Sequence, residues 1–552
     1  MADKPILQQF LASRRAFLKK AGLLSGAGLI LPPGLIARHS QSDNGNGRLT
    51  DGYGPGYGHG PSPGQDAGIH DDHSPADTVT DEVRQPATGR ILRIRGQVAA
   101  EGRGLGGVAV TDGLRIITTA DDGSFELLSD DRHLFVYISL PSGYKIPTNP
   151  TGTALFYRRI EPDSNGEMQV SFELVPDRRD RSRHRFLMMA DPQTENAYEV
   201  ERFHNETVPD IRQLVRDLGD ERPLFGIGGG DLMFDNLELF PEYERAVYKM
   251  GLPFFQLIGN HDILFDVPST QESYRVFQEF FGPTHYSFDV GEIHYVILNN
   301  IFWFSAGYVG YLDRDQLDWL KADLARIEPG RTVIVSMHIP AFSTQHLRLG
   351  GDRPSPRLST ANRDALYRIL EPHNAHILSA HMHENDHVFE GGLHEHNHGT
   401  ACGAWWTGPI CFDGTPNGYG VYEVRGSELR WQYKATGFSH DHQMRLYKRG
   451  ADPEAPDEFV ANIWDWDPEW KVFWYENGER RGEMVRRTGR DPLAVSLFDG
   501  PEKPERRTWI NPVPTHHLFY APVPETTGDI RVEAINRRGK RFTAKLSLYD
   551  VP

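Results

Sequence analysis

"FFQLIGNHD", residues 254–262, joins a mainly apolar run to three polar side chains. The run has the length and composition of a buried strand, and it stops at Gly259. An amide, an imidazole and a carboxylate follow at once: Asn260, His261 and Asp262. Packing gives no reason to place three polar groups where a chain leaves a buried strand. We therefore interpret the stretch as a strand that ends in ligand-type side chains.

Four further apolar runs of the same region end in similar side chains. "FLMMADPQ", "LFGIGGGD", "TVIVSMH" and "AHILSAHMH" end in, or just before, Asp191 with Gln193, Asp231, His338, and His381 with His383. Helical patterns with one apolar face, at 208–219 and 313–327, alternate with these runs, which predicts an α/β fold with buried strands. Ligands collect outside the carboxyl ends of strands in an open α/β sheet. The five strand ends therefore predict one shared site.

The residue types indicate a metal site. Two carboxylates, one amide oxygen and three imidazoles, without a thiolate, favour a borderline divalent metal such as Mn, Fe or Zn over Ca or Cu(I). Six candidate ligands exceed the needs of one tetrahedral ion, whereas two divalent metal ions with one bridging carboxylate would use them all. Any one of these residues alone is more often structural, so the interpretation depends on their joint occurrence.

These motifs resemble those of the calcineurin-like metallophosphoesterases. The family order is Asp-x-His, Gly-Asp, Gly-Asn-His-Asp/Glu, a lone His and Gly-His-x-His. It corresponds here to Asp191-Pro192-Gln193, Gly230-Asp231, Gly259-Asn260-His261-Asp262, His338 and Ala380-His381-Met382-His383. The resemblance implies a four-layer α/β/β/α sandwich. The flanking β segments also resemble those of a bacterial exported subgroup with the same domain order.

The resemblance also implies a role for each site residue. The first ion would be held by Asp191 and His383, the bridging position by Asp231, and the second ion by Asn260, His338 and His381. His261 would lie beside the ions and protonate the leaving oxygen or stabilise the transition state, with Asp235 orienting it. A metal-bound hydroxide would then attack a phosphate mono- or diester.

Two positions depart from the family pattern. Gln193 stands where the family usually has His. Its amide oxygen would be a weaker ligand for the first ion, or it would only hydrogen-bond the bridging water. Ala380 replaces a Gly, which adds one methyl group.

The segment 394–420 supplies candidate substrate contacts. We select His398, Trp405, Trp406 and Asp413 as walls of the substrate cleft. His394, His396 and His398 alternate, so a strand would place them on one face, either to bind phosphate or an extra metal or as a solvent-facing row. The two cysteines, Cys402 and Cys411, either pair in an oxidising compartment or stay free and buried.

Short alternating strands predict β domains on both sides of the central region. We expect an N-terminal β-sandwich domain at 91–176, the metallophosphoesterase domain at 178–437 and a C-terminal β-rich domain at 438–552. Four tryptophans between 464 and 474 form either a sugar-binding platform or strand packing.

The N-terminus is interpreted as an export signal. Arg14 and Arg15 precede a short apolar run at 21–31, which resembles a twin-arginine-type signal peptide over 1–37; an uncleaved anchor is the alternative. Residues 38–90 are rich in Gly, Pro, His and Asp and predict a disordered linker. We therefore expect a periplasmic or secreted protein that is exported folded and keeps no integral membrane segment after cleavage.

Composition limits the partners. The 552-residue chain has a formal net charge of −17, which disfavours a nucleic acid duplex. The expected function is an exported, dinuclear metal-dependent phosphoesterase acting on a phosphorylated small-molecule or envelope substrate. A nucleotide or cell-envelope phosphodiesterase and a non-catalytic binding protein with the same fold remain alternatives. The sequence leaves the substrate, the metals and the oligomeric state open.

Overall fold

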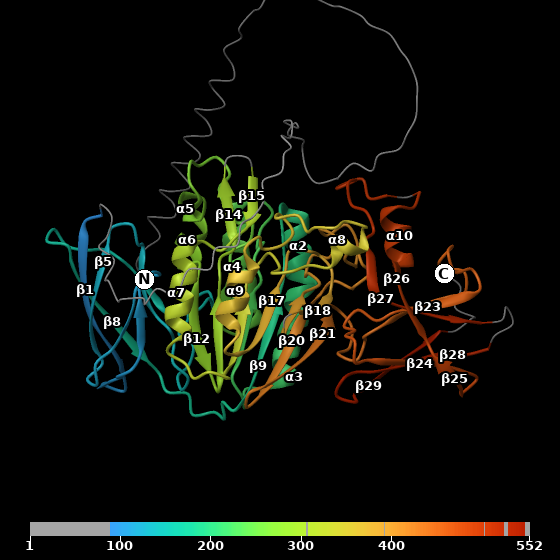
Figure 1. The fold of residues 1–552 in the computed structure, drawn as a ribbon, viewed down its shortest axis with the longest axis horizontal. Coiled ribbons are helices and arrows are strands. Elements are labelled where there is room, and N and C mark those ends of the chain that lie inside the picture. The colour runs from blue at the N-terminus through green and yellow to red at the C-terminus, as the bar shows by residue number, and fades with distance from the viewer. Residues whose placement is uncertain (1–88, 305–306, 391, 502, 524–527, 547–552) are drawn as a thin grey trace, which may run out of the picture. The chain divides into compact units, whose positions relative to one another are not determined.

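The computed structural model describes residues 89–304, 307–390, 392–501, 503–523 and 528–546 (Figure 1). All described residues belong to one compact unit, which lies within residues 60–552. The predicted signal peptide and residues 38–88 of the predicted linker lie outside the described residues.

Two mixed sheets form the central region. The first has the order β11-β10-β9-β20-β21 and comprises β9 (Arg183–Met189), β10 (Leu224–Gly228), β11 (Phe254–Gln256), β20 (Gly418–Arg425) and β21 (Glu428–Ala435). The second has the order β12-β13-β16-β17-β19-β18 and comprises β12 (Tyr286–Val290), β13 (Ile293–Ile297), β16 (Thr332–Ser336), β17 (Asn374–Ser379), β18 (Asp386–Glu390) and β19 (Leu393–Asn397). Strands β9, β10 and β11 pair in parallel, as do β13, β16, β17 and β19. Their carboxyl ends therefore lie on one edge of each sheet.

An aromatic core joins the two sheets. Phe225 of β10 packs edge-to-face on Tyr295 of β13 at 5.3 Å between ring centroids, and Phe186 of β9 does the same at 5.5 Å. Ile334 of β16 points into this core, whereas its neighbours Val333 and Val335 belong to the core on the opposite face of the second sheet. The alternation of side chains along β16 thus buries both faces of the sheet.

Helices cover the outer faces of both sheets (Figure 1). Helices α7 (Arg314–Leu324) and α9 (Arg363–Leu370) share the outer core of the second sheet. On the first sheet, Tyr243 of α4 (Phe240–Met250) donates to Gln256 of β11, and Tyr419 of β20 donates to Asp210 of α3 (Thr207–Leu218). Helix α2 (Ala197–Asn205) packs beside both. The central region is a four-layer α/β/β/α sandwich, which confirms the predicted fold class.

Shorter elements complete the central region. They are η1 (Leu237–Leu239), α5 (Thr270–Ser273), α6 (Arg275–Phe281), the hairpin β14 (Ile301–Phe304) and β15 (Gly307–Gly310), and α8 (Gln345–Arg348).

The N-terminal region forms two four-stranded sheets. One contains β1 (Ile91–Ala100), β2 (Arg103–Gly104), β5 (Ser124–Asp130) and β8 (Glu167–Leu174); the other contains β3 (Ala109–Thr111), β4 (Ile116–Thr118), β6 (Phe135–Ile138) and β7 (Tyr157–Arg159). Phe156 packs on Tyr286 of β12 with ring centroids 4.4 Å apart, so the apolar core continues into the central sandwich.

The C-terminal region is also built from two four-stranded sheets. One contains β22 (Arg445–Tyr447), β23 (Glu458–Asn462), β26 (Val485–Arg490) and β27 (Pro514–Pro522); the other contains β24 (Lys471–Glu476), β25 (Glu479–Glu483), β28 (Ile530–Ile535) and β29 (Arg541–Leu546). Helix α10 (Pro492–Phe498) connects strands of the first. Trp464 is fully buried, and Trp470 and Trp474 belong to the core between the sheets. Three of the four tryptophans are therefore packing residues rather than an open platform.

Several local predictions match the structure. The helix predicted at 208–219 is α3, which ends at Leu218, and Gly219 follows with φ 67°. The helical pattern predicted at 313–327 corresponds to α7, which ends at Leu324. Strands β20 and β21 form a hairpin around Arg425 and Gly426. No helix within the described residues is both long and apolar enough to span a membrane.

Candidate metal centre

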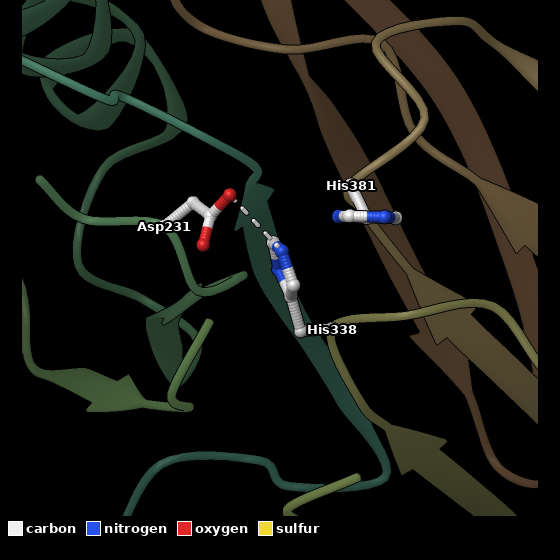
Figure 2. Close-up of side chains that lie close together, drawn as sticks. All are labelled: Asp231, His338 and His381. Carbon is white, nitrogen blue, oxygen red and sulfur yellow. Dashed lines mark ion pairs between the residues drawn. The ribbon is translucent and has the colours of Figure 1, made fainter. Parts of the chain in front are cut away.

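The predicted ligands meet at the carboxyl ends of the parallel strands. Asp231 follows β10, His338 follows β16 and His381 follows β17, and one ligand atom of each lies within 4.8 Å of the others. Figure 2 shows the carboxylate of Asp231 turned toward the ring of His338, with the ring of His381 beyond it. Residues separated by up to 150 positions thus reach one place because their strands end at the same edge.

The ring of His338 is held in the tautomer that a metal ligand needs. Its Nδ1 donates to the carbonyl oxygen of Gly229 at 2.9 Å, so the neutral ring carries its lone pair on Nε2. That Nε2 lies 3.2 Å from Asn260 Oδ1 and 3.2 Å from Asp231 Oδ2. With the amide of Asn260 in this orientation, three acceptor atoms face one another, and a cation between them would stabilise the arrangement.

The electrostatics of His338 also favour a positive charge at this position. Burial alone would lower the pKa of this ring, but the carboxylates of Asp231 and Asp191 outweigh it and raise the pKa to about 9. Without another cation, a proton on Nε2 would supply the positive charge. A divalent ion at this position would replace that proton.

His383 and Asp191 form a second pair in which a histidine lone pair faces a carboxylate oxygen. His383 Nδ1 donates to the carbonyl oxygen of Gly403 at 2.6 Å, which leaves the Nε2 lone pair 3.5 Å from Asp191 Oδ1. That oxygen is buried and has no hydrogen-bond partner among the described residues. The second oxygen of Asp191 accepts the backbone N–H of His381 at 3.1 Å. The unpartnered oxygen and the facing lone pair mark a second place for a cation.

His381 presents its other ring nitrogen to the site. Its Nε2 donates to the carbonyl oxygen of Arg357 at 2.9 Å, so Nδ1 carries the lone pair. Burial and the neighbouring His338 lower the pKa of His381 to about 3, so the ring is neutral and able to ligate. Three histidines therefore have their tautomers fixed by backbone carbonyl oxygens, as is usual behind metal ligands.

Backbone strain is concentrated at this centre. Eleven non-glycine residues of the described chain have positive φ, and eight of them belong to the predicted site. These eight are Asp191, Gln193, Asp231, Asp235, His381, His383, Trp405 and Trp406. Non-glycine residues in this region cost free energy, and they are found where surrounding contacts hold them, commonly at functional sites.

Glycines permit the close approach of the loops. A Cβ on Gly259 would lie 2.0 Å from the backbone nitrogen of Asp231, and one on Gly230 would lie 2.6 Å from His338 Nδ1. Asp262 then ties these loops together, because its carboxylate accepts the backbone N–H groups of Gly259 and Met233 at 2.9 and 3.1 Å. Asp262 thus supports the centre without facing it.

His261 lies at the solvent side of the centre. Its Nδ1 is 2.7 Å from Asp235 Oδ1, and its ring stacks on Phe234 with centroids 4.3 Å apart. Its side chain keeps 22% of its surface exposed, unlike the fully buried His338. Burial lowers the pKa of His261, but Asp231 and Asp235 together raise it above the usual value. The structure therefore brings together the pair that the sequence predicts as the acid and its positioning carboxylate.

Gln193 contacts the centre through its amide nitrogen. Nε2 donates to Asp231 Oδ2 at 2.6 Å, and the backbone N–H of Gln193 donates to the carbonyl oxygen of Asp231 at 3.0 Å. Its Oε1 lies 3.8 Å from Cys402 Sγ. Gln193 thus holds the carboxylate of Asp231, and direct ligation of an ion by Gln193 stays a prediction.

The predicted substrate residues separate into two groups. Trp405 stacks on His383 at 4.2 Å, and Trp406 donates from Nε1 to the carbonyl oxygen of Pro192 at 2.8 Å, so both border the centre. Asp413 and His398 are instead fully buried in hydrogen-bond networks: Asp413 with His517, and His398 with Tyr422 and Ser379. Substrate contact stays a prediction for all four.

The alternating histidines lie on one face, as predicted, but they do not face solvent. His394, His396 and His398 are 6%, 0% and 0% exposed, and they point from β19 and the residue after it toward β20 and β21. Burial lowers the pKa of His398 to about 3, so this ring is neutral at pH 7. The alternative of a solvent-facing row is therefore wrong.

The cysteines are free thiols. Cys402 and Cys411 are both buried and unpaired, and each Sγ lies 3.7 Å from Thr400 Oγ1. Burial raises the pKa of both thiols well above the usual value, which keeps them protonated and unreactive.

Sequence reasoning missed three residues that support the centre. Phe234 stacks on His261, and the guanidinium of Arg507 lies 4.3 Å from the centroid of the Phe234 ring. The third, Arg357, fixes the tautomer of His381 through its carbonyl oxygen. Phe234 could have been noticed because it lies between Asp231 and Asp235. Arg507 and Arg357 come from distant segments and carry no local signal.

Two parts of the chain match models of a known protein family. Models described as the N terminal and the C terminal of calcineurin-like phosphoesterase match residues 92–177 and 395–542. The chain therefore carries regions similar to both terminal parts of the calcineurin-like phosphoesterases. The C-terminal match begins inside the segment 178–437 assigned to the central domain from the sequence, and the predicted domain boundaries stay predictions.

Two curated relatives of this chain are phosphatases by name. The bovine (Bos taurus) serine/threonine-protein phosphatase CPPED1 is 29% identical over 137 residues, which is 24% of this chain and 42% of the relative. Purple acid phosphatase 22 of Arabidopsis thaliana is 28% identical over 140 residues, which is 25% of this chain and 26% of the relative. The chain therefore spans less than half the length of either relative.

Among solved structures, purple acid phosphatase PPD1 from yellow lupin (Lupinus luteus) is 14% identical. The match covers 63% of this chain and 67% of that one, with a TM-score of 0.34. At this TM-score the likeness carries no argument about function.

The residues present fit divalent metal ions. His338, Asp231 and Asn260 surround one place with acceptor atoms, and the pair formed by His383 and the unpartnered Asp191 oxygen marks another. Nitrogen and oxygen donors without thiolate suit Mn, Fe or Zn.

Proposed function

We propose that this protein is a dinuclear metal-dependent phosphoesterase that hydrolyses a phosphorylated small molecule or a phosphorylated envelope component. The observation that carries the proposal is the pair of acceptor-only clusters at the strand ends, with His261 held beside them by Asp235. The phosphatase names of the two relatives support the reaction class, although this chain covers only part of each.

The two ions would share the bridging carboxylate of Asp231. Asp191 and His383 would hold the first, and Asn260, His338 and His381 the second. When bound, two divalent ions lower the pKa of water and neutralise charge on a phosphoryl group. The contribution of Gln193 is to keep Asp231 oriented through its 2.6 Å hydrogen bond.

His261 would act on the leaving group. Its Nδ1 is engaged by Asp235, so Nε2 is the atom available to a substrate. Asp231 and Asp235 raise the pKa of His261, which favours its protonated form, and an imidazolium can protonate the leaving oxygen or stabilise charge on the phosphoryl group. Phe234 restrains the ring by stacking, so Nε2 keeps a fixed direction.

The test compares metal dependence and substrate class in one series. The purified full chain is stripped with a chelator, reloaded with Mn, Fe or Zn, and assayed on p-nitrophenyl phosphate and bis-p-nitrophenyl phosphate. We expect metal-dependent hydrolysis of at least one ester, lost together with bound metal in Asp231→Asn. Asp318→Asn, on the outer side of α7, is the matched control and should retain both.

Each result is decisive for the reaction class. Preference for the first ester identifies a phosphomonoesterase, and preference for the second a phosphodiesterase. Metal binding without hydrolysis of either ester, or of a nucleotide panel, would contradict the proposal and favour a binding protein that keeps the fold.

Export is a separate part of the proposal. It rests on Arg14 and Arg15 ahead of the apolar run at 21–31, and a twin-arginine signal would carry the protein across the membrane folded. Arg14→Lys with Arg15→Lys should leave the protein in the cytoplasmic fraction. Unchanged recovery outside the cytoplasm would contradict this part alone.

A further inference from the structure

We propose that the protein holds an additional divalent metal ion, of the Zn or Mn type, on His387, His396 and Asp465. One ligand atom of each lies within 4.8 Å of the others. His387 is on β18, His396 is on β19, and Asp465 follows β23 in the C-terminal region. None of the three belongs to the strand-end centre.

The place is closed to solvent. His387, His396 and Asp465 are 7%, 0% and 1% exposed. The imidazole rings of His387 and His396 are close-packed, with 4.0 Å between their centroids. A buried carboxylate beside buried imidazoles needs a compensating charge or a complete set of hydrogen bonds. The hydrogen bonds around His396 decide which of the two is present.

The count around His396 comes out one proton short. Four contacts run in a line: Asn385 Oδ1 to His396 Nε2 at 3.0 Å, His396 Nδ1 to the hydroxyl of Tyr422, that hydroxyl to His398 Nε2 at 2.7 Å, and His398 Nδ1 to Ser379 O at 2.9 Å. Both ends of the line are acceptors. Two neutral imidazoles and one hydroxyl carry three protons in all. Four contacts cannot be satisfied by three protons.

The amide of Asn385 cannot be turned to repair the count. Its Nδ2 donates to the carbonyl oxygen of Trp464 at 2.8 Å, and its Oδ1 accepts the backbone N–H of Gly399 at 3.1 Å. Reversing the amide would break both bonds. A fourth proton would instead put an imidazolium in a site shielded from water, which burial strongly disfavours.

A cation on His396 Nε2 removes the mismatch. Nδ1 then donates to Tyr422, the hydroxyl donates to His398 Nε2, and His398 Nδ1 donates to Ser379. Each of the three protons serves one contact, and the ion occupies the fourth position.

The second line of contacts accepts the same ion. His387 Nε2 lies 3.0 Å from Asp465 Oδ1, His387 Nδ1 lies 3.0 Å from His394 Nε2, and His394 Nδ1 lies 3.2 Å from His376 Nδ1. With an ion on His387 Nε2, the remaining ring protons all point outward along the line. The tautomers that ligation requires are therefore available on both histidines, and the ion would replace the direct contact between His387 Nε2 and Asp465 Oδ1.

The supporting contacts are those of a structural metal site. The second oxygen of Asp465 accepts the backbone N–H of Tyr433 at 3.1 Å, which fixes the carboxylate. Asn385 Oδ1, next to His396 Nε2, is positioned to be the fourth ligand. Four protein ligands with no open position hold a metal for stability rather than for catalysis. The ion would fasten the segment after β23 to the edge formed by β18 and β19.

The experiment counts metal ions per chain in the purified full-length protein by elemental analysis. The test variants are Asp465→Asn and His396→Gln, and His373→Gln, a histidine before β17 outside the cluster, is the matched control. We expect each test variant to hold about one ion per chain fewer than wild type. We also expect a lower melting temperature and unchanged turnover of p-nitrophenyl phosphate per folded molecule. The control should match wild type in all three.

Direct observation of the metal removes the dependence on folding of the variants. Crystals of the wild-type protein grown with Zn²⁺ should show an anomalous peak between His387, His396 and Asp465. No peak there, or an equal metal count in wild type and folded Asp465→Asn, would overturn the inference. Failure of the strand-end centre is distinguishable, because it would remove ions that depend on Asp231 and leave the ion that depends on Asp465.

Discussion

The strand-end centre and the buried histidine cluster of β18 and β19 use the same residue types in opposite structural settings. In the centre, the functional side chains follow the strands, and Asp191, Asp231 and His381 have φ values of 43°, 49° and 70°. In the cluster, His387 and His396 lie within regular strands and do not have positive φ. The centre also keeps an exposed group, His261, whereas the cluster is closed.

This difference separates catalysis from stabilisation. Loops after strands can adopt strained conformations that aim several side chains at a substrate, and the strain is held by surrounding contacts such as those of Asp262. Residues inside strands are fixed by the ladder and by packing, so a metal there would gain rigidity but no access. The same sheet thus supports a reactive edge and a closed interior.

The largest expected effect is at the exposed side of the centre. His261→Asn should reduce turnover by roughly two to four orders of magnitude, because a general acid contributes about that much. Metal content should stay at the wild-type level, since His261 is not in either acceptor cluster. Steady-state kinetics with elemental analysis makes the comparison, and loss of an ion from this variant would show that His261 is a ligand.

A smaller effect is expected at Gln193, which contacts the centre through Asp231. Gln193→Ala removes the 2.6 Å hydrogen bond to Asp231 and should weaken metal affinity or activity by about 10–100-fold. Asp191→Ala should lose the first ion outright. Metal titration of both variants and of wild type tests whether Gln193→Ala weakens metal binding less than Asp191→Ala does. Equal loss in both would mean that Gln193 is itself a full ligand.

The smallest effect concerns His294 on β13, a buried histidine whose two ring nitrogens contact carboxylates. Burial alone would lower its pKa, but Asp323 and Asp289 outweigh burial and raise the pKa to about 9. Because this value lies above the unfolded value of about 6.5, the stabilisation is complete below about pH 6.5 and is lost as the pH rises through about 9.

His294→Gln should therefore destabilise the protein by about 1–3 kcal/mol at pH 6 and by much less at pH 9.5. Melting temperatures of both proteins across this range measure the gap. A gap that stays constant with pH would contradict an ionised pair in the strand interior.

Most of the fold and of the strand-end centre could be predicted from the sequence, for identifiable reasons. Buried strands that end in Asp191, Asp231 or His338 are visible as apolar runs with a polar end, and their convergence follows from parallel pairing. The role of Gln193 could not be predicted, because an amide offers both a donor and an acceptor and only the fold decides which one faces Asp231.

Contacts between residues far apart in the sequence explain what could not be predicted. His398 and Asp413 lie in a segment of polar residues that resembles a cleft wall, yet Tyr422 and His517 bury them from other strands. Arg507, 273 positions after Phe234, reaches the centre only because the C-terminal region folds back on it. No local pattern reports such a contact.

The most direct measurement is an anomalous-difference map from crystals of the wild-type protein grown with Mn²⁺. We predict one anomalous peak between His338 Nε2, Asn260 Oδ1 and Asp231 Oδ2, and a second beside His383 Nε2 and Asp191 Oδ1. Crystals of Asp231→Asn should lose density at both positions. An active wild-type protein with no ion at either position would contradict the central claim.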